Sequence, residues 1–198
     1  MIIKLTNKVT NFIKQNSNIK NTDDLEKINY ALQAILNEVF KIIIIITLFF
    51  FIGTLNYLLF SMVILFSIRI FSGGLHANTS LKCLIWSTLF FTITSVIGPL
   101  LPELNSLFYY ILGLLNILII TVKSPYPNAK RSAKNKKRRC ILKIIAIFST
   151  IVWTIIILFY LNDKYYLNCG IITISLISIQ LLYNKNNEEI NNEKIQTL

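Results

Sequence analysis

The sequence contains a single histidine, His76, and a cysteine, Cys83, follows it seven residues later. A cysteine within reach of a histidine is a nucleophile with its general base, because the imidazole takes the thiol proton and leaves the reactive thiolate. Seven residues of one straight helix would separate the two side chains by about 10 Å along the axis, too far for a hydrogen bond. The pair therefore predicts a break in the helix, and Gly73 and Gly74 give the backbone freedom just before His76.

A helix that starts next to the cysteine would strengthen this chemistry. Asn78, Thr79 and Ser80 are all residue types that cap helix N-termini. With Ser80 as the cap, Cys83 is the third helical residue, where the positive end of the helix dipole and the neighbouring Lys82 favour the thiolate. We expect a Cys/His dyad, because no Asp or Glu lies next to the motif to orient the ring. Asn78 and Ser80 are expected to support the site, and either Asn78 or a backbone carbonyl would orient His76.

Each of these residues also has a purely structural explanation. Cys83 can be a small packed side chain near an interfacial His76, and Arg69 can be a positive-inside anchor. Cys140 lies among basic residues without a base, and Cys169 is expected to serve packing. Three cysteines in three different environments make a poor disulfide framework, so we expect thiols. One His and scattered Cys cannot assemble a four-ligand metal site, so we expect neither a metal nor another cofactor.

The elements that position this segment are predicted to be membrane-spanning helices. Only 15% of the residues are charged and 54% are hydrophobic, so the charges are too few to coat a soluble globule. Five intervals without charge have the ~18 or more residues needed to cross about 30 Å of hydrocarbon: 42–68, 84–102, 104–122, 144–162 and 165–184. They are continuously apolar rather than alternating, which excludes a transmembrane β-barrel. We predict an all-α, polytopic membrane helical bundle that forms a single integral membrane domain over residues 1–198.

A basic loop orients this bundle in the membrane. Residues 123–143 contain nine Lys or Arg and no acidic residue, and the positive-inside rule places such a loop in the cytoplasm. Counting crossings from it puts the turns at Pro102-Glu103 and Asn162-Asp163-Lys164 outside. The catalytic segment 69–83 and the C-terminus then face the cytoplasm. We attribute the charge to topology and to anionic headgroups rather than to nucleic acid.

The amphipathic region 1–41 leaves the start of the bundle open. Residues 42–68 are long for one crossing and too short for two, so we expect one tilted span or a span broken near Gly53. Residues 23–41 show helical periodicity behind a capping signal at Asp23 and can supply a sixth crossing if their polar face meets protein or a wet cavity. A second amphipathic pattern predicts an interfacial helix lying on the membrane. Its apolar residues are Ile2, Leu5, Val9, Phe12 and Ile13.

The residues around the cysteine resemble the signature of the accessory gene regulator protein B family. The similarity is sharpest over residues 69–87, and it rests on Arg69, Gly73-Gly74, His76-Ala77, Cys83 and Ser87. The size, the hydrophilic N-terminal third and the basic loop extend it over most of the chain. It implies a membrane cysteine endopeptidase of Gram-positive bacteria, which removes the C-terminal part of a short precursor peptide (AgrD-like) during maturation of a cyclic quorum-sensing autoinducer.

The resemblance also implies roles for individual residues. Cys83 would be the nucleophile, His76 the general base, and Arg69 and Gly74 supporting residues, with Gly73 beside them. A thioester on Cys83 would pass to a nucleophile within the precursor and close a thiolactone or lactone ring. The family further implies a homodimer in the lipid bilayer. Because the spans lack strong polar glue, we expect them to associate by packing.

Two other classes of protein stay open. A transporter or exporter of the same peptide would act without proteolysis, but proton-coupled carriers usually place ionisable residues within their spans. Here every predicted span is uncharged, and the sequence has no Gly-Lys-Ser/Thr loop for ATP. A non-catalytic scaffold would leave the segment 69–83 without a purpose. Precursor cleavage that depends on Cys83 would separate these classes.

Overall fold

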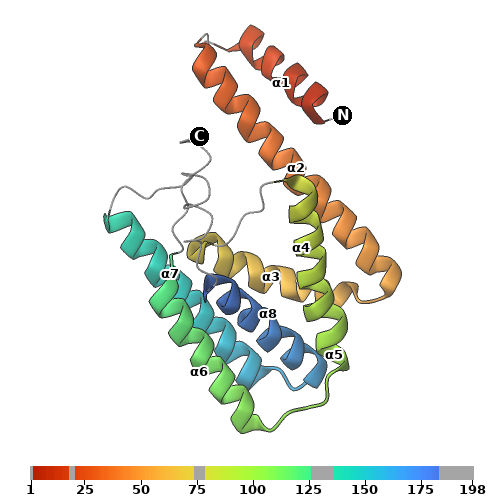
Figure 1. Ribbon diagram of the computed structural model, residues 1–198, viewed down its shortest axis with the longest axis vertical. Helices are drawn as coiled ribbons and strands as arrows, with labels where there is room; N and C mark the ends of the chain where they lie inside the picture. The colour runs from red at the N-terminus through yellow and green to blue at the C-terminus, as the bar shows by residue number, and fades with distance from the viewer. Residues whose placement is uncertain (1, 18–20, 74–78, 126–135, 183–198) are drawn as a thin grey trace, which may run out of the picture. The chain divides into compact units, whose positions relative to one another are not determined.

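The computed structural model describes residues 2–17, 21–73, 79–125 and 136–182, and this part of the chain contains helices and no strands (Figure 1). Within it, six helices are long and apolar enough to cross a membrane, which confirms the predicted all-α bundle. The helices are α1 (Ile2–Asn16), α2 (Thr22–Ile52), α3 (Leu55–Ser72), α4 (Ser80–Thr92), α5 (Gly98–Leu100), α6 (Ser106–Lys123), α7 (Lys136–Ile155) and α8 (Lys164–Leu182), with π-helical turns η1 (Ile93–Ile97) after α4 and η3 (Ile156–Tyr160) after α7.

The chain forms two compact units, Met1–Gly53 and Thr54–Leu198. In the first unit, α1 packs on α2 through its polar face. Thr6 and Thr10 are buried, and Asn29 Nδ2 donates a hydrogen bond to Asn7 Oδ1 at 2.9 Å. Most of the apolar side chains described on α1 point away from α2, as an interfacial helix requires, whereas Ile13 is half-buried. The exposed ones are Leu5, Val9 and Phe12.

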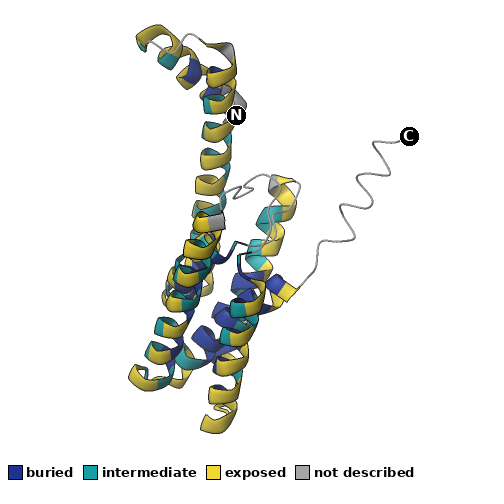
Figure 2. Ribbon diagram, turned by 90° about the vertical axis from the view of Figure 1, so that its left-hand side faces the viewer, coloured by how far each residue is buried: buried dark blue, intermediate teal, exposed yellow. Residues whose placement is uncertain are grey.

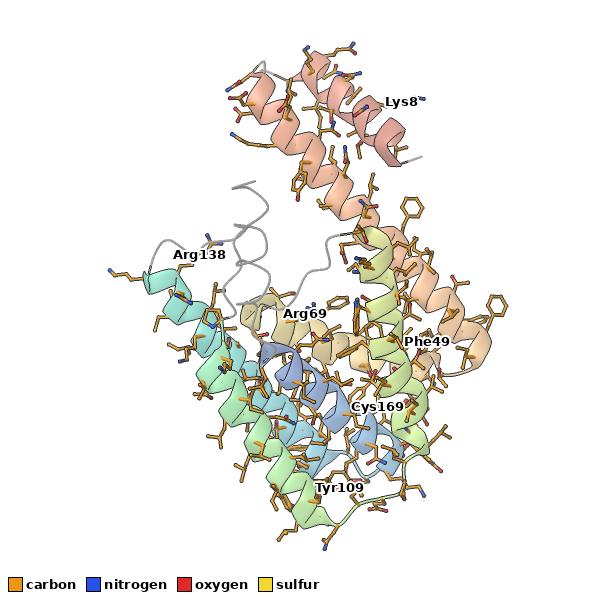
Figure 3. All side chains as sticks on the ribbon, viewed as in Figure 1. Lys8, Phe49, Arg69, Tyr109, Arg138 and Cys169 are labelled. Atoms are coloured by element: carbon orange, nitrogen blue, oxygen red, sulfur yellow. The ribbon has the colours of Figure 1, made fainter. Side chains whose placement is uncertain are left out.

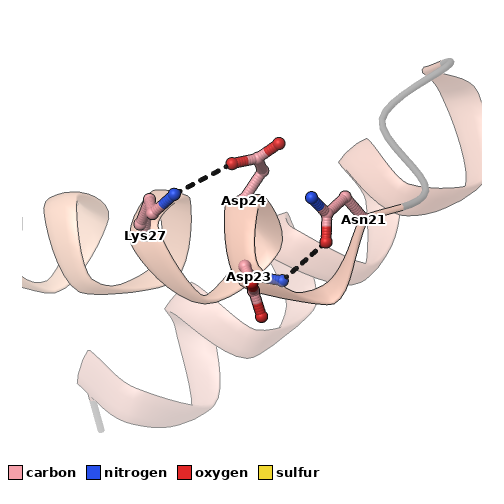
Figure 4. A network of polar contacts seen from close by, with 4 residues as sticks. All are labelled: Asn21, Asp23, Asp24 and Lys27. Atoms are coloured by element: carbon pink, nitrogen blue, oxygen red, sulfur yellow. Dashed lines mark hydrogen bonds and ion pairs between the residues drawn. The ribbon is translucent and has the colours of Figure 1, made fainter.

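The cap of helix α2 lies two residues before its predicted capping signal. The N-cap is Asn21, not Asp23: the Asn21 side chain accepts the Asp23 backbone N–H at 3.2 Å, and Lys27 pairs with Asp24 at 3.2 Å (Figure 4). The aspartates lie in the first turn, where the positive end of the helix favours them. From there α2 continues for 31 residues, or about 46 Å. The amphipathic segment 23–41 and the apolar residues after it are thus one helix.

Gly53 ends this helix with a φ of 81°, in the left-handed conformation that glycine adopts readily. Its N–H donates to the carbonyl of Phe50 at 3.1 Å, and α3 begins two residues later. The interval 42–68 is therefore broken at Gly53, as one of the two predicted alternatives has it, but the break separates two helices and does not interrupt a single span. Each part belongs to a helix long enough to span a membrane.

In the second unit, α8 is the most buried of the candidate spans, and α3, α5 and α6 pack against it while α7 packs against α3 and α6. Outward-facing apolar side chains stay exposed on each of these spans (Figure 2), as expected where lipid is the solvent. The fully buried aliphatic side chains include Leu58, Ile64, Ile68, Ile120, Ile157, Ile171, Ile174 and Ile177. The core of this unit thus lies where α3, α6 and η3 meet α8.

Small polar side chains also join helices inside this unit. Ser61 Oγ on α3 lies 3.0 Å from Cys169 Sγ on α8 and accepts hydrogen bonds from Thr173 at 3.2 Å and from Ser95 of η1 at 3.4 Å. All four residues are buried. Such bonds between helices stabilise membrane bundles. The expectation that the spans lack strong polar contacts is therefore wrong for contacts within the chain. Hydroxyl groups carry no charge, so the distribution of charged residues does not reveal them.

Both predicted outer turns lie between helices. The turn at 161–163 separates η3 from α8, and the residues after α5 lead into α6. Tyr109 ties this second connection to α8: its hydroxyl accepts the Leu104 N–H at 3.0 Å and donates to Asn168. The Asn168 amide in turn donates to the Leu101 carbonyl at 3.0 Å. The described helices therefore begin and end where the predicted turns require.

Candidate active site

The predicted catalytic segment leaves α3 at Gly73. This residue has a φ of 77° and a ψ of −165°, a region of backbone conformation that is essentially reserved for glycine. Its N–H donates to the carbonyl of Arg69 at 3.0 Å and closes the last turn of α3. Gly73 therefore provides the backbone freedom that the sequence pattern predicts.

The Arg69 side chain is directed to another helix of the bundle. Arg69 lies on α3 (Figure 3). Its Nη1 donates to Oε1 of Gln180 near the end of α8 at 3.2 Å, and both residues are half-buried. A positive-inside anchor needs only lipid headgroups, so this contact exceeds what the anchor explanation requires. Sequence reasoning missed Gln180, because one uncharged amide near the end of an apolar span has no local signature.

Two further hydrogen bonds join the end of α3 to α7. Trp153 Nε1 donates to the hydroxyl of Ser67 at 2.6 Å, and the Ser149 hydroxyl donates to the Ser67 carbonyl at 3.1 Å. Ser72 is buried and donates to the Gly73 carbonyl at 3.2 Å. The helix that leads into the catalytic segment is thus fixed from two sides.

The cap of α4 is Thr79. Its side chain accepts the Lys82 N–H at 3.3 Å from an extended backbone, φ −127° and ψ 147°. The reading with Ser80 as the cap is therefore wrong, because the threonine one residue earlier already satisfies the amide three positions on. Cys83 becomes the fourth helical residue, and its N–H donates to the Thr79 carbonyl at 3.0 Å. The Cys83 side chain is half-buried in the first turn of α4.

Several predicted site residues lie outside what the structure describes. They are Gly74, His76 and Asn78, together with the side chain of Ser80. The dyad and its supporting contacts therefore stay predictions. Of the site residues, the structure fixes the flanks: Arg69 and Gly73 on one side, and the helix start that holds Cys83 on the other.

The other cysteines are in different surroundings. Cys169 is buried, as its packing role predicts, whereas Cys140 is exposed near the start of α7, and neither these two nor Cys83 is in a disulfide. Across the described ranges, no three His, Cys, Asp or Glu side chains lie close enough to hold a metal ion. The basic segment 123–143 begins at the end of α6 and includes exposed Arg138 and Arg139 in the first turns of α7.

Comparison with known proteins extends the local resemblance to the whole chain. A family model described as Accessory gene regulator B matches residues 6–181. The chain is 39% identical over 182 residues to a putative AgrB-like protein of Clostridium beijerinckii, covering 92% of this chain and 89% of the relative. It is 32% identical over 183 residues to accessory gene regulator protein B of Staphylococcus saprophyticus, covering 90% and 95%. No solved structure matches it.

The family match spans the described helices from α1 to α8 and includes the candidate site. The six candidate membrane spans fit the same assignment. The chain therefore belongs to the accessory gene regulator B family of quorum-sensing membrane proteins.

Proposed function

We propose that the protein is a membrane cysteine endopeptidase, which removes the C-terminal part of an AgrD-like precursor peptide. The observation that supports this most is the place of Cys83. It is a half-buried thiol in the first turn of a helix, directly after the short segment that holds the chain's single histidine. Membership of a quorum-sensing family supports a peptide precursor as the proposed substrate.

In the proposed first step, the Cys83 sulfur attacks the scissile carbonyl while His76 accepts the thiol proton. The tetrahedral intermediate collapses, and the peptide C–N bond breaks. The leaving amine takes its proton from His76 and departs as the N-terminus of the cut fragment. The N-terminal part of the precursor stays on Cys83 as a thioester.

The second step closes the ring. A thiol or hydroxyl within the bound peptide attacks the thioester, the acyl–sulfur bond of Cys83 breaks, and Cys83 recovers its proton. With a thiol, this exchange is nearly balanced because one thioester replaces another. Loss of the cut fragment therefore has to pull the reaction forward. A site at the membrane interface would limit hydrolysis of the intermediate by excluding water.

The proposed topology follows from the basic segment 123–143. Its charge places residues 69–83 and the C-terminus in the cytoplasm, where a newly made precursor meets the site. The break at Gly53 extends the crossing count through α3 and α2, so the N-terminus is assigned to the cytoplasm as well. The proposal includes a cell-membrane location and a homodimer, as the resemblance implies.

The test is precursor cleavage by full-length protein in proteoliposomes. Wild type and Cys140→Ser, a matched change at an exposed cysteine, should release the C-terminal fragment. Cys83→Ser should reduce cleavage by roughly 10³-fold or more while the protein stays inserted. Cleavage by Cys83→Ser at the wild-type rate would contradict the proposal. Transfer of uncut precursor across the vesicle membrane without any cleavage would favour the transporter class.

A further inference from the structure

We propose that Gln180 is a positioning residue for the reaction at Cys83, which acts by holding Arg69. The proposal rests on the proposed peptidase function. Gln180 Oε1 accepts a hydrogen bond from Arg69 Nη1 at 3.2 Å, and the two residues are 111 positions apart. The contact joins the end of α3, where the catalytic segment begins, to the end of α8.

The acceptor stands on a fixed part of the bundle. Ile177 and Leu181, on the same helix, are each only 2% exposed, and α8 packs against α3 and α6. An arginine side chain has many rotamers and is drawn to lipid headgroups at the end of a span. The amide of Gln180 selects the rotamers that keep the guanidinium against the bundle.

Movement at Arg69 would be passed on to the catalytic segment. The Arg69 carbonyl accepts the Gly73 N–H at 3.0 Å, and Gly73 adopts the φ of 77° that sets the direction in which the chain leaves α3. Arg69 thus contacts α8 through its side chain and the start of the segment through its backbone. Loss of the Gln180 amide removes the side-chain contact with α8. The backbone of Arg69 at the start of the segment is then held less firmly.

The amide also differs from a carboxylate at this position. Gln180 accepts the hydrogen bond without bringing a negative charge to the guanidinium. A Glu at 180 would keep the bond and add a negative charge, whereas a Leu would remove the bond at similar volume. The two changes therefore separate the placement of Arg69 from its electrostatic effect.

The chain offers a matched control for a hydrogen bond made by α8. Asn116 on α6 donates to the hydroxyl of Ser175 at 2.9 Å, and this pair is also partly buried. Ser175 lies five residues before Gln180 on the same helix. Ser175→Ala removes a comparable bond between helices without touching the end of α3.

The experiment measures precursor cleavage and thermal midpoint for full-length variants in proteoliposomes. We expect Gln180→Ala and Gln180→Leu to lower kcat about tenfold, with KM changed less than about twofold, from the loss of one hydrogen bond to a charged group. Gln180→Glu should recover at least about a third of the wild-type kcat if placement dominates. Ser175→Ala should lower the thermal midpoint as much as Gln180→Ala and leave kcat within about twofold.

A double-mutant cycle locates the effect. In the background of Arg69→Ala, Gln180→Ala should lower kcat no further, because its partner is gone. Additive losses, or equal kcat for Gln180→Ala and Ser175→Ala, would overturn the proposal. If wild type cuts no precursor, the peptidase function itself fails. The rate of Cys83 alkylation by a maleimide then tests the positioning role by itself. A change of about threefold or more in Gln180→Ala, absent in Ser175→Ala, supports this role. Equal alkylation rates in the two variants refute it.

Discussion

The two flanks of the catalytic segment are held in different ways. The end of α3 makes side-chain hydrogen bonds to two other helices, through Arg69 to Gln180 of α8 and through Ser67 to Trp153 of α7. The start of α4 is ordered by bonds within its own first turn, from Lys82 and Cys83 to Thr79. Tertiary packing of the span that α4 begins comes from its continuation, where η1 and α5 contact α8.

This difference assigns different tasks to the flanks. A flank bonded to two helices is a fixed reference, because moving it breaks several contacts at once. The cap of α4 contributes only about 1 kcal/mol. Loss of this cap should therefore disturb the start of α4 less than loss of Arg69 disturbs the end of α3. Changes at Arg69 and Gly73 should accordingly have larger effects on kcat than changes at the cap of α4.

The largest effect is expected at Arg69. Arg69→Met keeps much of the side-chain length but removes the guanidinium and its bond to Gln180. We expect kcat for precursor cleavage to fall about hundredfold, which corresponds to roughly 3 kcal/mol for a charged hydrogen-bonding group. Circular dichroism should show unchanged helix content. A wild-type kcat in this variant would show that Arg69, and the flank that it holds, has no part in the reaction.

Gly73→Ala should come next. Alanine strains the backbone at φ 77° and ψ −165° by about 2 kcal/mol, so the chain should leave α3 in a new direction and kcat should fall about thirtyfold. Gly53→Ala is the control, since Gly53 also has a positive φ but ends α2 in the other unit. It should lower the thermal midpoint and leave kcat within about twofold. Equal losses of kcat in both variants would show a general effect of strain.

A smaller effect is expected at the locally ordered flank. Thr79→Ala removes the cap of α4 and should lower kcat about fivefold, from the loss of about 1 kcal/mol at the helix start. Thr79→Ser keeps the capping oxygen and should recover most of the activity. Failure of Thr79→Ser to recover activity would mean that the methyl group, not the cap, matters at this position.

Trp153→Phe should have the smallest effect. It removes the indole N–H that donates to Ser67 and keeps an aromatic ring near Phe60. Because Arg69 still holds the end of α3 to α8, we expect a loss of about 1 kcal/mol in unfolding free energy and at most a twofold change in kcat. A drop in kcat as large as that of Arg69→Met would show that α7, not α8, fixes this flank.

Charge-free intervals predicted the spans well because lipid tolerates few charges, and the turns between them carry the polar residues. The sequence left the region before α3 open, and the structure shows why. The polar residues Gln33 and Asn37 belong to the same helix as the apolar residues up to Ile52, and only the conformation of Gly53 ends it. A search for uniformly apolar intervals therefore separates the polar and apolar parts of this one helix.

The site was predictable only where its signals are local. Gly73 before a histidine predicts a break in the helix, and α3 ends at Ser72, directly before Gly73 with its φ of 77°. The choice between Thr79 and Ser80 as the cap depends on backbone angles that three adjacent capping residues do not determine. The contact of Arg69 with Gln180 joins residues that are far apart in the sequence, and the acceptor is an uncharged amide. No spacing of residues in the sequence predicts such a contact.

The central claim is that Cys83 forms a thioester with the precursor. The most direct measurement is mass spectrometry of the full-length protein after reaction with a precursor whose internal cysteine is changed to Ala, so that the ring cannot close. Wild type should accumulate an adduct with the mass of the N-terminal precursor part, and Cys83→Ala should show neither adduct nor cleavage. Normal cleavage by Cys83→Ala, or no adduct on wild type where turnover of this precursor stops, would contradict the account.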